Sequence, residues 1–442
     1  MESVLLFVLG VVVILIGLAV SIGLHEIGHL VPAKRFGVKV GQYMIGFGPT
    51  IWKRKVGETE YGVKALPLGG YISMAGMFPP ARPGTKARTA STGFFDTLVQ
   101  DARTSSADTI TAGDEDRVFY KLPMWKRIVI MLGGPFMNLL IAVVLYAVVL
   151  CGFGLPQASL TIGSVSECII PAGQDRDECA STDDPAPAAA AGIVAGDTIV
   201  SVDGTPAETW ADATAIIRAS GGQPVTLVVL RDGVERTLEL TPVLTERLVY
   251  DDRGEPVIGE DGEPVTEQVG LIGITAAYEN VPQPATAVLP AVGDNIVRVG
   301  EILITLPVRL WQVGEAAFGG GERDPNGPIG VVGIGRLAGE ITSYQDAPVV
   351  NRVAQLTGML ASLNVALFVF NLIPLLPLDG GHVAGALWEA LRRRIAQLRG
   401  RPDPGPVDTA RLIPLTLAVS AVLGVMTLLL VYADIVNPIT FL

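Results

Sequence analysis

The amino-acid sequence predicts a polytopic α-helical membrane protein that also carries a β-hairpin and a small α+β domain. Of its 442 residues, 49% are hydrophobic, so the chain is too apolar for an ordinary soluble protein and too long for one compact domain. Four apolar runs reach the roughly 20 residues that cross a bilayer. The predicted transmembrane helices lie near residues 4–24, 127–152, 356–376 and 412–432.

The first apolar run could instead be a secretory signal peptide. However, it lacks a basic n-region, is longer than an h-region, and continues into the letters HEIGH without a small-residue cleavage site. These features favour a helix that stays in the membrane.

Basic residues predict the orientation of the helices. Lysine and arginine crowd between the first two spans and again after the third, whereas the long segment between the second and third spans has no lysine and many acidic residues. The positive-inside rule places the basic loops in the cytoplasm, and the acidic segment and both termini outside. The net charge of −12 gives no sign of a nucleic-acid surface, and the arginines at 392–394 indicate a topology anchor near anionic lipid.

Two segments follow the first span. Residues 37–77 consist of short β-like runs broken by glycine and proline, which predicts a hairpin or small sheet. Residues 78–116 are rich in Ala, Thr, Ser, Gly and Asp and have little hydrophobic periodicity, which predicts a flexible cytoplasmic insertion.

The segment between the second and third spans contains a predicted small domain. Residues 180–245 alternate as expected for two strands, a helix at 210–219 and two more strands. Residues 246–268 indicate an acidic loop that can form a hairpin. Residues 284–318 are amphipathic and are expected to lie against the membrane surface, with a soluble helix pair as the alternative.

The three cysteines differ in their predicted surroundings. Cys168 and Cys179 lie in the segment that is predicted to be outside, where a disulfide can form, and two free thiols are the alternative. Cys151 falls in the second span and is predicted to be an inert core thiol.

A metal site is predicted at the end of the first span. His25 and His29 are four residues apart, so they face the same side of a helix. Two imidazoles at this spacing bind zinc, and Glu26 between them can activate a metal-bound water. A pair of buried, hydrogen-bonded histidines is the alternative. Ionisable groups inside a bilayer cost roughly 2.5–3.5 kcal/mol each on insertion scales, which favours the functional reading.

The third zinc ligand is predicted after the third span. A catalytic zinc takes three protein ligands and keeps one position open for water. The stretch NLIPLLPLDGGH ends in His382, but Asp379 within it is the better candidate. The prolines and glycines of this stretch cannot sustain a regular helix. Irregular backbone at membrane depth is tolerated only where it lines protein or a water-filled cavity. The break therefore predicts a carboxylate that turns towards the metal.

HEIGH, GGPFMN and NLIPLLPLDGGH, one on each of the first three spans, resemble the site-2 protease family of intramembrane zinc metalloproteases. The closest likeness is to actinobacterial members with one PDZ domain, a cysteine pair after the second span and a VYADIVNPI tail. GPTIWKRKVGETEYGVKALPLGG resembles the family's membrane re-entrant β-hairpin, AAGIVAGDTIVSVDG its PDZ signature, and PIGVVGI the segment before the third span. The resemblance covers residues 1–77, 117–155, about 185–245 and 327–385.

The resemblance implies one Zn²⁺ ion per chain, held by His25, His29 and Asp379, with Glu26 as catalytic base. It also implies that Asn364 and Asn371 support the substrate and the site; they are two helical turns apart and so share a face. The hairpin around Tyr61–Tyr71 is the predicted edge for β-augmentation by substrate, with Asn371 as a candidate donor to the extended chain. Its candidate substrate-binding residues are Gly69, Gly70 and Tyr71.

The predicted segments alternate between membrane and aqueous parts. They are 1–36, the first transmembrane helix; 37–77, the re-entrant hairpin; 78–116, the insertion; 117–155, the second transmembrane helix; 156–183, the Cys-pair loop; 184–245, the extracytoplasmic PDZ domain; 246–354, a linker with amphipathic helices; 355–385, the third transmembrane helix with LDGG; 386–411, a cytoplasmic basic segment; and 412–442, the fourth transmembrane helix and tail.

The predicted function is cleavage of single-pass transmembrane proteins in the cell membrane, with the active site near the cytoplasmic side. The resemblance implies that the substrates are anti-sigma factors already trimmed by another protease. One alternative is a non-catalytic PDZ scaffold with a structural zinc, which would normally need a fourth protein ligand. Another is a zinc-dependent metal transporter, which would need more polar residues in the second and fourth spans. No clear GLGF-type carboxylate loop is found, so the PDZ-like domain could be only a spacer.

Overall fold

The computed structural model describes residues 2–79, 94–111, 113–170, 179–180, 183–249, 257–259, 264–321, 323–325, 327–407 and 409–439. The chain divides into two compact units. The first combines residues 1–153 with 284–442, and the second comprises residues 154–283.

Within the described residues, four helices of the first unit are long and apolar enough to cross a membrane, as predicted. The third begins and ends earlier than the predicted 356–376. Pro374 and Pro377 cannot continue the helix, so it stops at Asn371. The four are α1 (Glu2–Arg35), α3 with the π-helical η2 (Met124–Ala147 and Val148–Phe153), α8 (Val349–Asn371), and α10 preceded by η4 (Ile413–Val436 and Thr409–Leu412).

Glycines bring α1 close to two neighbouring helices. A Cβ atom on Gly28 would collide with the backbone of Gly133 on α3. One on Gly10 would collide with the backbone of Ala338 on α7 (Val331–Ser343). Small residues at such crossings let helix backbones approach in a membrane, where no hydrophobic effect drives association. Gly28 and Gly133 thus set the spacing between the HEIGH helix and the second span.

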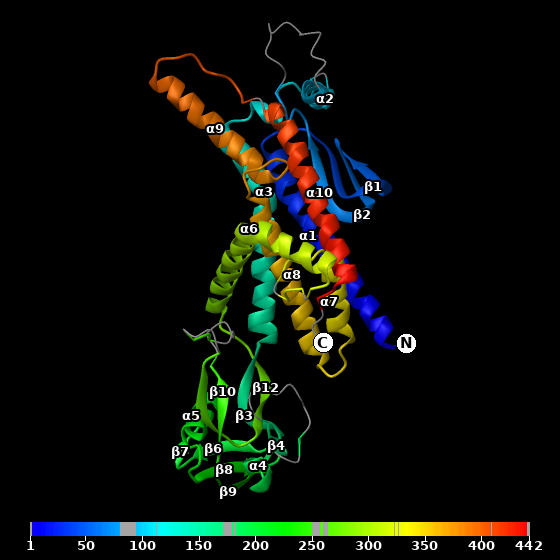
Figure 1. The fold of residues 1–442 in the computed structure, drawn as a ribbon. Helices are drawn as coiled ribbons and strands as arrows, with labels where there is room; N and C mark the ends of the chain where they lie inside the picture. The colour runs from blue at the N-terminus through cyan, green and yellow to red at the C-terminus, as the bar shows by residue number, and fades with distance from the viewer. Residues whose placement is uncertain are drawn as a thin grey trace. The chain divides into compact units, whose positions relative to one another are not determined.

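The amphipathic stretch at 284–318 forms one helix, α6 (Val288–Gly319), rather than a pair. Its ribbon bends midway along its length (Figure 1), and Pro307 lies inside the helix, a residue that removes a backbone hydrogen bond and kinks helices.

A buried ion pair holds the end of α10 to the segment after α6. Arg323 Nη1 lies 2.9 Å from Asp434 Oδ1. The other carboxylate oxygen of Asp434 accepts hydrogen bonds from the backbone N–H groups of Gly330 (2.9 Å) and Gly333 (2.7 Å), at the N-terminus of α7. A helix N-terminus favours such a negative charge.

The predicted hairpin consists of β1 (Val40–Val56) and β2 (Thr59–Met74), with several register shifts. Met44 pairs with both Tyr71 and Gly62. The first half of β1 therefore lies between two segments of β2, residues 60–63 and 70–74. The buried side of this half of β1 packs on the C-terminal end of α1, through Leu30 among others.

The described second half of the insertion predicted at 78–116 contains a helix that the sequence analysis did not expect. Residues 94–108 form helix α2 (Phe94–Asp108). Apolar residues recur at helical spacing through this short stretch, which the composition of the whole segment conceals. Ser106 joins α2 to the end of the hairpin, because its hydroxyl accepts from the Phe78 N–H at 3.0 Å. Residues 80–93 lie outside the described part.

The second unit is built on a sheet in the order β12-β3-β6-β8-β9, with the short β7 beside β6. Its core is formed by the inward residues of β6 and β8 and of helix α5 (Trp210–Ala219), among them Val202, Leu227 and Ala213. The strands are β3 (Leu155–Val165), β6 (Thr198–Val202), β7 (Thr205–Pro206), β8 (Val225–Arg231), β9 (Val234–Leu240) and β12 (Ile274–Val281).

The second unit, residues 154–283, extends beyond the domain predicted at 184–245 on both sides. β3 comes from the predicted Cys-pair loop and β12 from the predicted linker, and the two pair with each other at one edge of the sheet. The predicted acidic loop is closed by a hairpin of β10 (Val243–Leu248) and β11 (Thr266–Leu271). Strands this far apart in sequence pair only through tertiary contacts, so local alternation did not connect them.

Helix α5 (Trp210–Ala219) has the predicted bounds, and a capping box explains where it starts. The Thr209 hydroxyl accepts from the Asp212 N–H at 3.2 Å, and the Asp212 carboxylate accepts from the Thr209 N–H at 2.9 Å.

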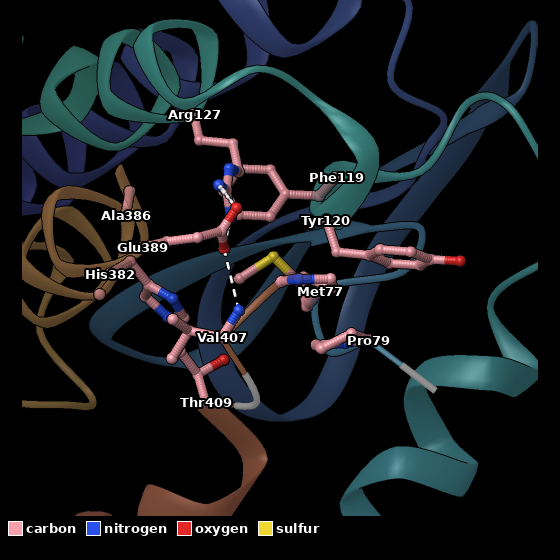
Figure 2. A pocket seen from close by; sticks show the side chains of 12 residues that line it. Met77, Pro79, Phe119, Tyr120, Arg127, His382, Ala386, Glu389, Val407 and Thr409 are labelled. Atoms are coloured by element: carbon pink, nitrogen blue, oxygen red, sulfur yellow. Dashed lines mark hydrogen bonds and ion pairs between the residues drawn. The ribbon is translucent and has the colours of Figure 1, made fainter. Parts of the chain in front are cut away.

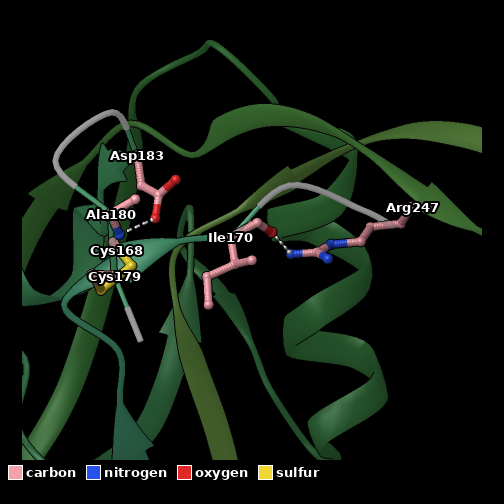
Figure 3. The surroundings of a disulfide bond; sticks show 6 residues. All are labelled: Cys168, Ile170, Cys179, Ala180, Asp183 and Arg247. Carbon is pink, nitrogen blue, oxygen red and sulfur yellow. Dashed lines mark hydrogen bonds between the residues drawn. A yellow bond between two sulfur atoms is a disulfide. The ribbon is translucent and has the colours of Figure 1, made fainter. Parts of the chain in front are cut away.

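Two further contacts fix loops of the second unit. Cys168, in β4 (Cys168–Ile169), is joined to Cys179 by a disulfide (Figure 3). Asp197 accepts from Arg231 Nε at 2.6 Å and from the Val194 N–H at 3.0 Å. The Arg231 guanidinium holds the pKa of the Asp197 carboxyl below its usual range.

Candidate metal centre

Three potential ligands meet where α1 approaches the start of α9 (Asp379–Leu398). The Nε2 atoms of His25 and His29 lie 3.1 Å apart. Both face Asp379 Oδ2, at 3.4 and 3.3 Å respectively. The helical spacing of HEIGH and the break at LDGG thus bring together the three side chains that the sequence singled out.

The other ring nitrogens indicate which histidine tautomers are present. His29 Nδ1 lies 2.7 Å from the carbonyl oxygen of Ile130. A carbonyl can only accept, so this nitrogen carries the proton and the Nε2 lone pair of His29 is free. That arrangement is typical of a metal-binding histidine.

Asn138 on α3 lies beside Nδ1 of His25, as the Ile130 carbonyl does beside Nδ1 of His29. No pattern in the sequence pointed to Asn138. Its side-chain nitrogen lies 3.1 Å from His25 Nδ1, while its Oδ1 is buried without a hydrogen-bond partner among the described residues. With the amide turned by 180°, Oδ1 accepts from Nδ1–H, Nδ2 takes the buried position that Oδ1 held, and the His25 Nε2 lone pair is free.

This donor set fits a zinc ion. With both Nδ1 atoms protonated, three lone-pair atoms converge with no hydrogen between them. Asp379 Oδ2 is buried and has no hydrogen-bond partner in the part of the chain that the structure describes. Buried polar atoms are rarely left this way, and a cation bound by two imidazoles and one carboxylate satisfies all three.

Glycines of α3 make room for the two imidazole rings. A Cβ atom on Gly134 would collide with the rings of both His25 and His29. The GGP letters of the second span therefore do more than permit close helix packing. They keep side chains out of the space that the histidines occupy.

The LDGG turn is equally tight. A Cβ atom on Gly380 would collide with the carbonyl oxygens of Leu372 and Ile373, and one on Gly381 would meet the backbone of Leu376. The loop after α8 therefore folds directly onto the first turn of α9. Only glycine at both positions allows Asp379 to begin that helix beside the histidines.

Glu26 is buried and lies against β2 of the hairpin. A Cβ atom on Gly70 would be 2.9 Å from Glu26 Cγ. Of the other predicted hairpin residues, Tyr71 donates its hydroxyl to Gln42 Oε1 at 3.3 Å and stacks on Phe47, and Gly69 lies close to that same ring. The structure thus brings Gly70 to the glutamate, and Gly69 and Tyr71 to Phe47.

Asn364 and Asn371 lie on α8, and within the described chain neither forms a hydrogen bond with any of the three potential ligands. Asn364 is fully buried and donates to Ser21 Oγ at 3.0 Å, one turn before His25. Its Oδ1 has no partner within the described chain. Asn371, the last residue of α8, donates to the Leu367 carbonyl at 3.0 Å.

His382 does not join the ligands. It lies one turn further along α9 and lines a pocket with Arg127 of α3 and Glu389 of α9 (Figure 2). Arg127 and Glu389 form a buried ion pair, with Arg127 Nη2 lying 2.7 Å from Glu389 Oε1. Glu389 also accepts a hydrogen bond from the Val407 N–H at 3.0 Å. This pair anchors α9 to α3. A single arginine at the start of an apolar span was its only sequence signal.

A histidine pair, an aspartate and a buried glutamate brought together on helices long and apolar enough to cross a membrane are typical of a membrane metalloprotease. Comparison with known proteins agrees. The Peptidase family M50 profile matches residues 13–402. The chain is 35% identical to zinc metalloprotease Rip1 of Mycobacterium tuberculosis, covering 98% of this chain and 99% of that protein. It is 36% identical to zinc metalloprotease Rip1 of Mycolicibacterium smegmatis, covering 99% of each. It is 29% identical to metalloprotease MmpA of Caulobacter vibrioides, covering 88% of each.

The chain therefore belongs to Peptidase family M50, the site-2 protease family, and is a membrane zinc metalloprotease.

Proposed function

We propose that His25, His29 and Asp379 hold the zinc ion and that Glu26 is the general base. The observation that carries this proposal is that the Nε2 atoms of His25 and His29 converge on Asp379 Oδ2, which has no hydrogen-bond partner among the described residues. The buried Glu26 directly follows His25 in the chain. Zinc supplies a Lewis acid that polarises the peptide carbonyl and lowers the pKa of water. Glu26 takes a proton from the attacking water and delivers it to the leaving amine. Burial keeps bulk water from competing for that proton.

We further propose that the substrate is held as an extended strand beside Glu26. A helical peptide bond is shielded and its carbonyl is engaged in a hydrogen bond, so the substrate span has to unwind. Residues 61–63 of the predicted edge pair with β1 on both sides, so they are interior and cannot receive a strand. Residues 70–74 pair with β1 on one side alone, within the described chain, and contact Glu26 through Gly70. β-Augmentation at this edge grips a backbone of any sequence.

A photo-crosslinker can test which part of the hairpin meets the substrate. Placed at Tyr71 it should capture a single-span substrate, whereas the same group at Tyr61, which is paired on both sides, should not. Substrates with Gly or Pro in the span should also be cleaved faster than an all-leucine span, because unwinding costs them less. Equal capture at both positions and equal rates for both substrates would remove the edge from the mechanism.

The second unit is proposed to be a PDZ domain outside the cell membrane, and the active site to lie near the cytoplasmic side. The order of strands and helix in the second unit supports the PDZ assignment. The basic loops support the proposed orientation of the chain in the membrane. The proposed substrates are single-pass membrane proteins of the anti-sigma-factor type, already trimmed outside.

Purified protein in lipid discs should hold one zinc per chain and cleave such a single-span protein. Zinc binding without any cleavage would favour the scaffold alternative. Quantitative membrane proteomics of cells carrying Glu26→Ala should show accumulated single-span fragments, and their absence would contradict the proposed substrate class.

A further inference from the structure

The far half of α9 presents an apolar stripe that the described chain does not cover. At 3.6 residues per turn its members fall within an arc of about 100°. Figure 1 shows this end of α9 extending away from the other helices of its unit. The stripe consists of large hydrophobic side chains that are 38–79% exposed: Leu387, Trp388, Leu391, Ile395 and Leu398.

Arginines border the stripe on both sides. On the same helical projection Arg394 lies about 20° beyond one edge and Arg399 about 20° beyond the other. Both are exposed, and the described residues offer neither of them an ion-pair partner. The opposite side of the helix is the one that faces protein, because Glu389 is buried there against Arg127.

We propose that residues 387–399 are a docking surface for a bilayer that contains anionic phospholipid. A helix with one apolar face, a polar remainder and arginines at the boundary lies in the membrane interface, with the apolar side chains inserted and the cations at headgroup level. The surface continues from a unit that already crosses the membrane, since α9 starts a few residues after the α8 span.

A second copy of the chain is the main competing occupant, and the charges disfavour it. Two stripes laid face to face would bring their arginine borders together, and like charges across an interface oppose association. An anionic surface instead attracts both borders, by about fivefold in affinity for each arginine.

Docking would also affect the position of Asp379 at the candidate metal centre. Asp379 is the first residue of α9, and Glu389, midway along it, is tied to α3. Seating the far half on the membrane therefore fixes the direction of the helix that carries the carboxylate. The docking proposal itself stands whether or not the chain is proteolytically active.

Hydrogen exchange tests the proposal on the full-length Glu26→Gln protein, so that proteolysis plays no part. The protein is placed in phosphatidylcholine discs and in discs that also contain phosphatidylglycerol. Amides of 387–399 should exchange more slowly in the anionic discs. Arg394→Glu/Arg399→Glu should raise their exchange there by at least about tenfold. The control Arg218→Glu/Arg236→Glu, an equal charge change on exposed positions of the second unit, should leave them unchanged.

A second measurement does not depend on exchange rates. Brominated lipid should quench the fluorescence that is lost in Trp388→Phe, and Leu391→Asp/Leu398→Asp should abolish that quenching. The same exchange in both kinds of disc, or no quenching of Trp388, would overturn the proposal. Protection that appears only with two copies per disc would overturn it in favour of a second chain.

Discussion

Asp434, which is buried, and Asp379, which is half-buried with its Oδ2 inside the protein, differ in how their charge is satisfied. Asp434 has an arginine on one oxygen and two backbone N–H groups on the other. Asp379 Oδ2 faces two imidazole nitrogens whose lone pairs also point inward, and it has no donor among the described residues. The charge of Asp434 is neutralised by the chain itself. The charge of Asp379 is not neutralised in this way within the described chain, as expected for the proposed zinc ligand.

The largest contrast is expected on removing the charge of Asp379. Asp379→Asn should lose most of the bound zinc and all measurable cleavage, since one of three ligands is weakened. In zinc-free protein the same change should cost little stability, because no protein partner is lost. Metal analysis and thermal unfolding with and without chelator measure both. Normal zinc content with lost activity would move Asp379 out of the ligand set and bring His382 back into consideration.

Glu26→Gln separates the chemistry from the ligands. Cleavage should fall by at least about 10²–10⁴-fold, because an amide cannot take the proton of the attacking water. Zinc content should stay at the wild-type level, since the ligands are untouched. Turnover that survives this change would show that another group is the base.

Asp434→Asn should have the opposite profile to Asp379→Asn. It leaves Arg323 buried without its counter-charge, which should lower the free energy of unfolding by about 3–5 kcal/mol. Folded protein should still bind zinc fully. Thermal unfolding in discs and zinc content of the folded fraction are the measurements, and a loss of zinc without loss of stability would erase the distinction between the two aspartates.

Asn138 tests the proposed tautomer of His25. Asn138→Leu should weaken zinc binding by about 10–100-fold, as loss of a metal histidine's hydrogen-bond partner does. Asn138→Asp keeps an acceptor and should retain most of the affinity. Asn295→Leu, on α6, is the matched control and should leave it unchanged. Chelator competition gives the affinities. If the aspartate variant is as weak as the leucine variant, the amide donates to His25 rather than accepts.

The smallest effect is expected at Asp197 in the second unit, a carboxylate satisfied as Asp434 is. Its pKa is depressed in the folded state by Arg231, so the stabilisation is present above the unfolded value, about 3.9. It is lost as the pH falls below that value through the lower folded pKa. Asp197→Asn should flatten this dependence, and Glu235→Gln, an exposed control, should not. Hydrogen exchange of the second unit between pH 3 and 6 measures it, and identical profiles for wild type and Asp197→Asn would refute it.

Local patterns in the sequence predicted those features that depend on spacing along one element. The four spans follow from hydropathy, the helix at 210–219 from the pattern of residues 180–245, and the shared face of His25 and His29 from helical periodicity. Asp379 was found because prolines and glycines broke a helix at membrane depth.

Features that depend on which elements meet were missed or misplaced. Asn138 lies on a different span from His25, and its role requires the close crossing at Gly28 and Gly133. β3 and β12 pair across the whole second unit. The free edge of the hairpin follows from its bulged register, which alternation alone does not reveal.

The order in which the ribosome makes the chain gives the LDGG turn a further meaning. The two histidines emerge first, whereas Asp379 follows only after three spans and the whole second unit have been synthesised. A nascent chain that stalls before LDGG therefore contains HEIGH but lacks the third of the proposed zinc ligands. Under the proposed ligand set, such a chain has an incomplete metal site, and full zinc binding is expected only after the first three spans have been made.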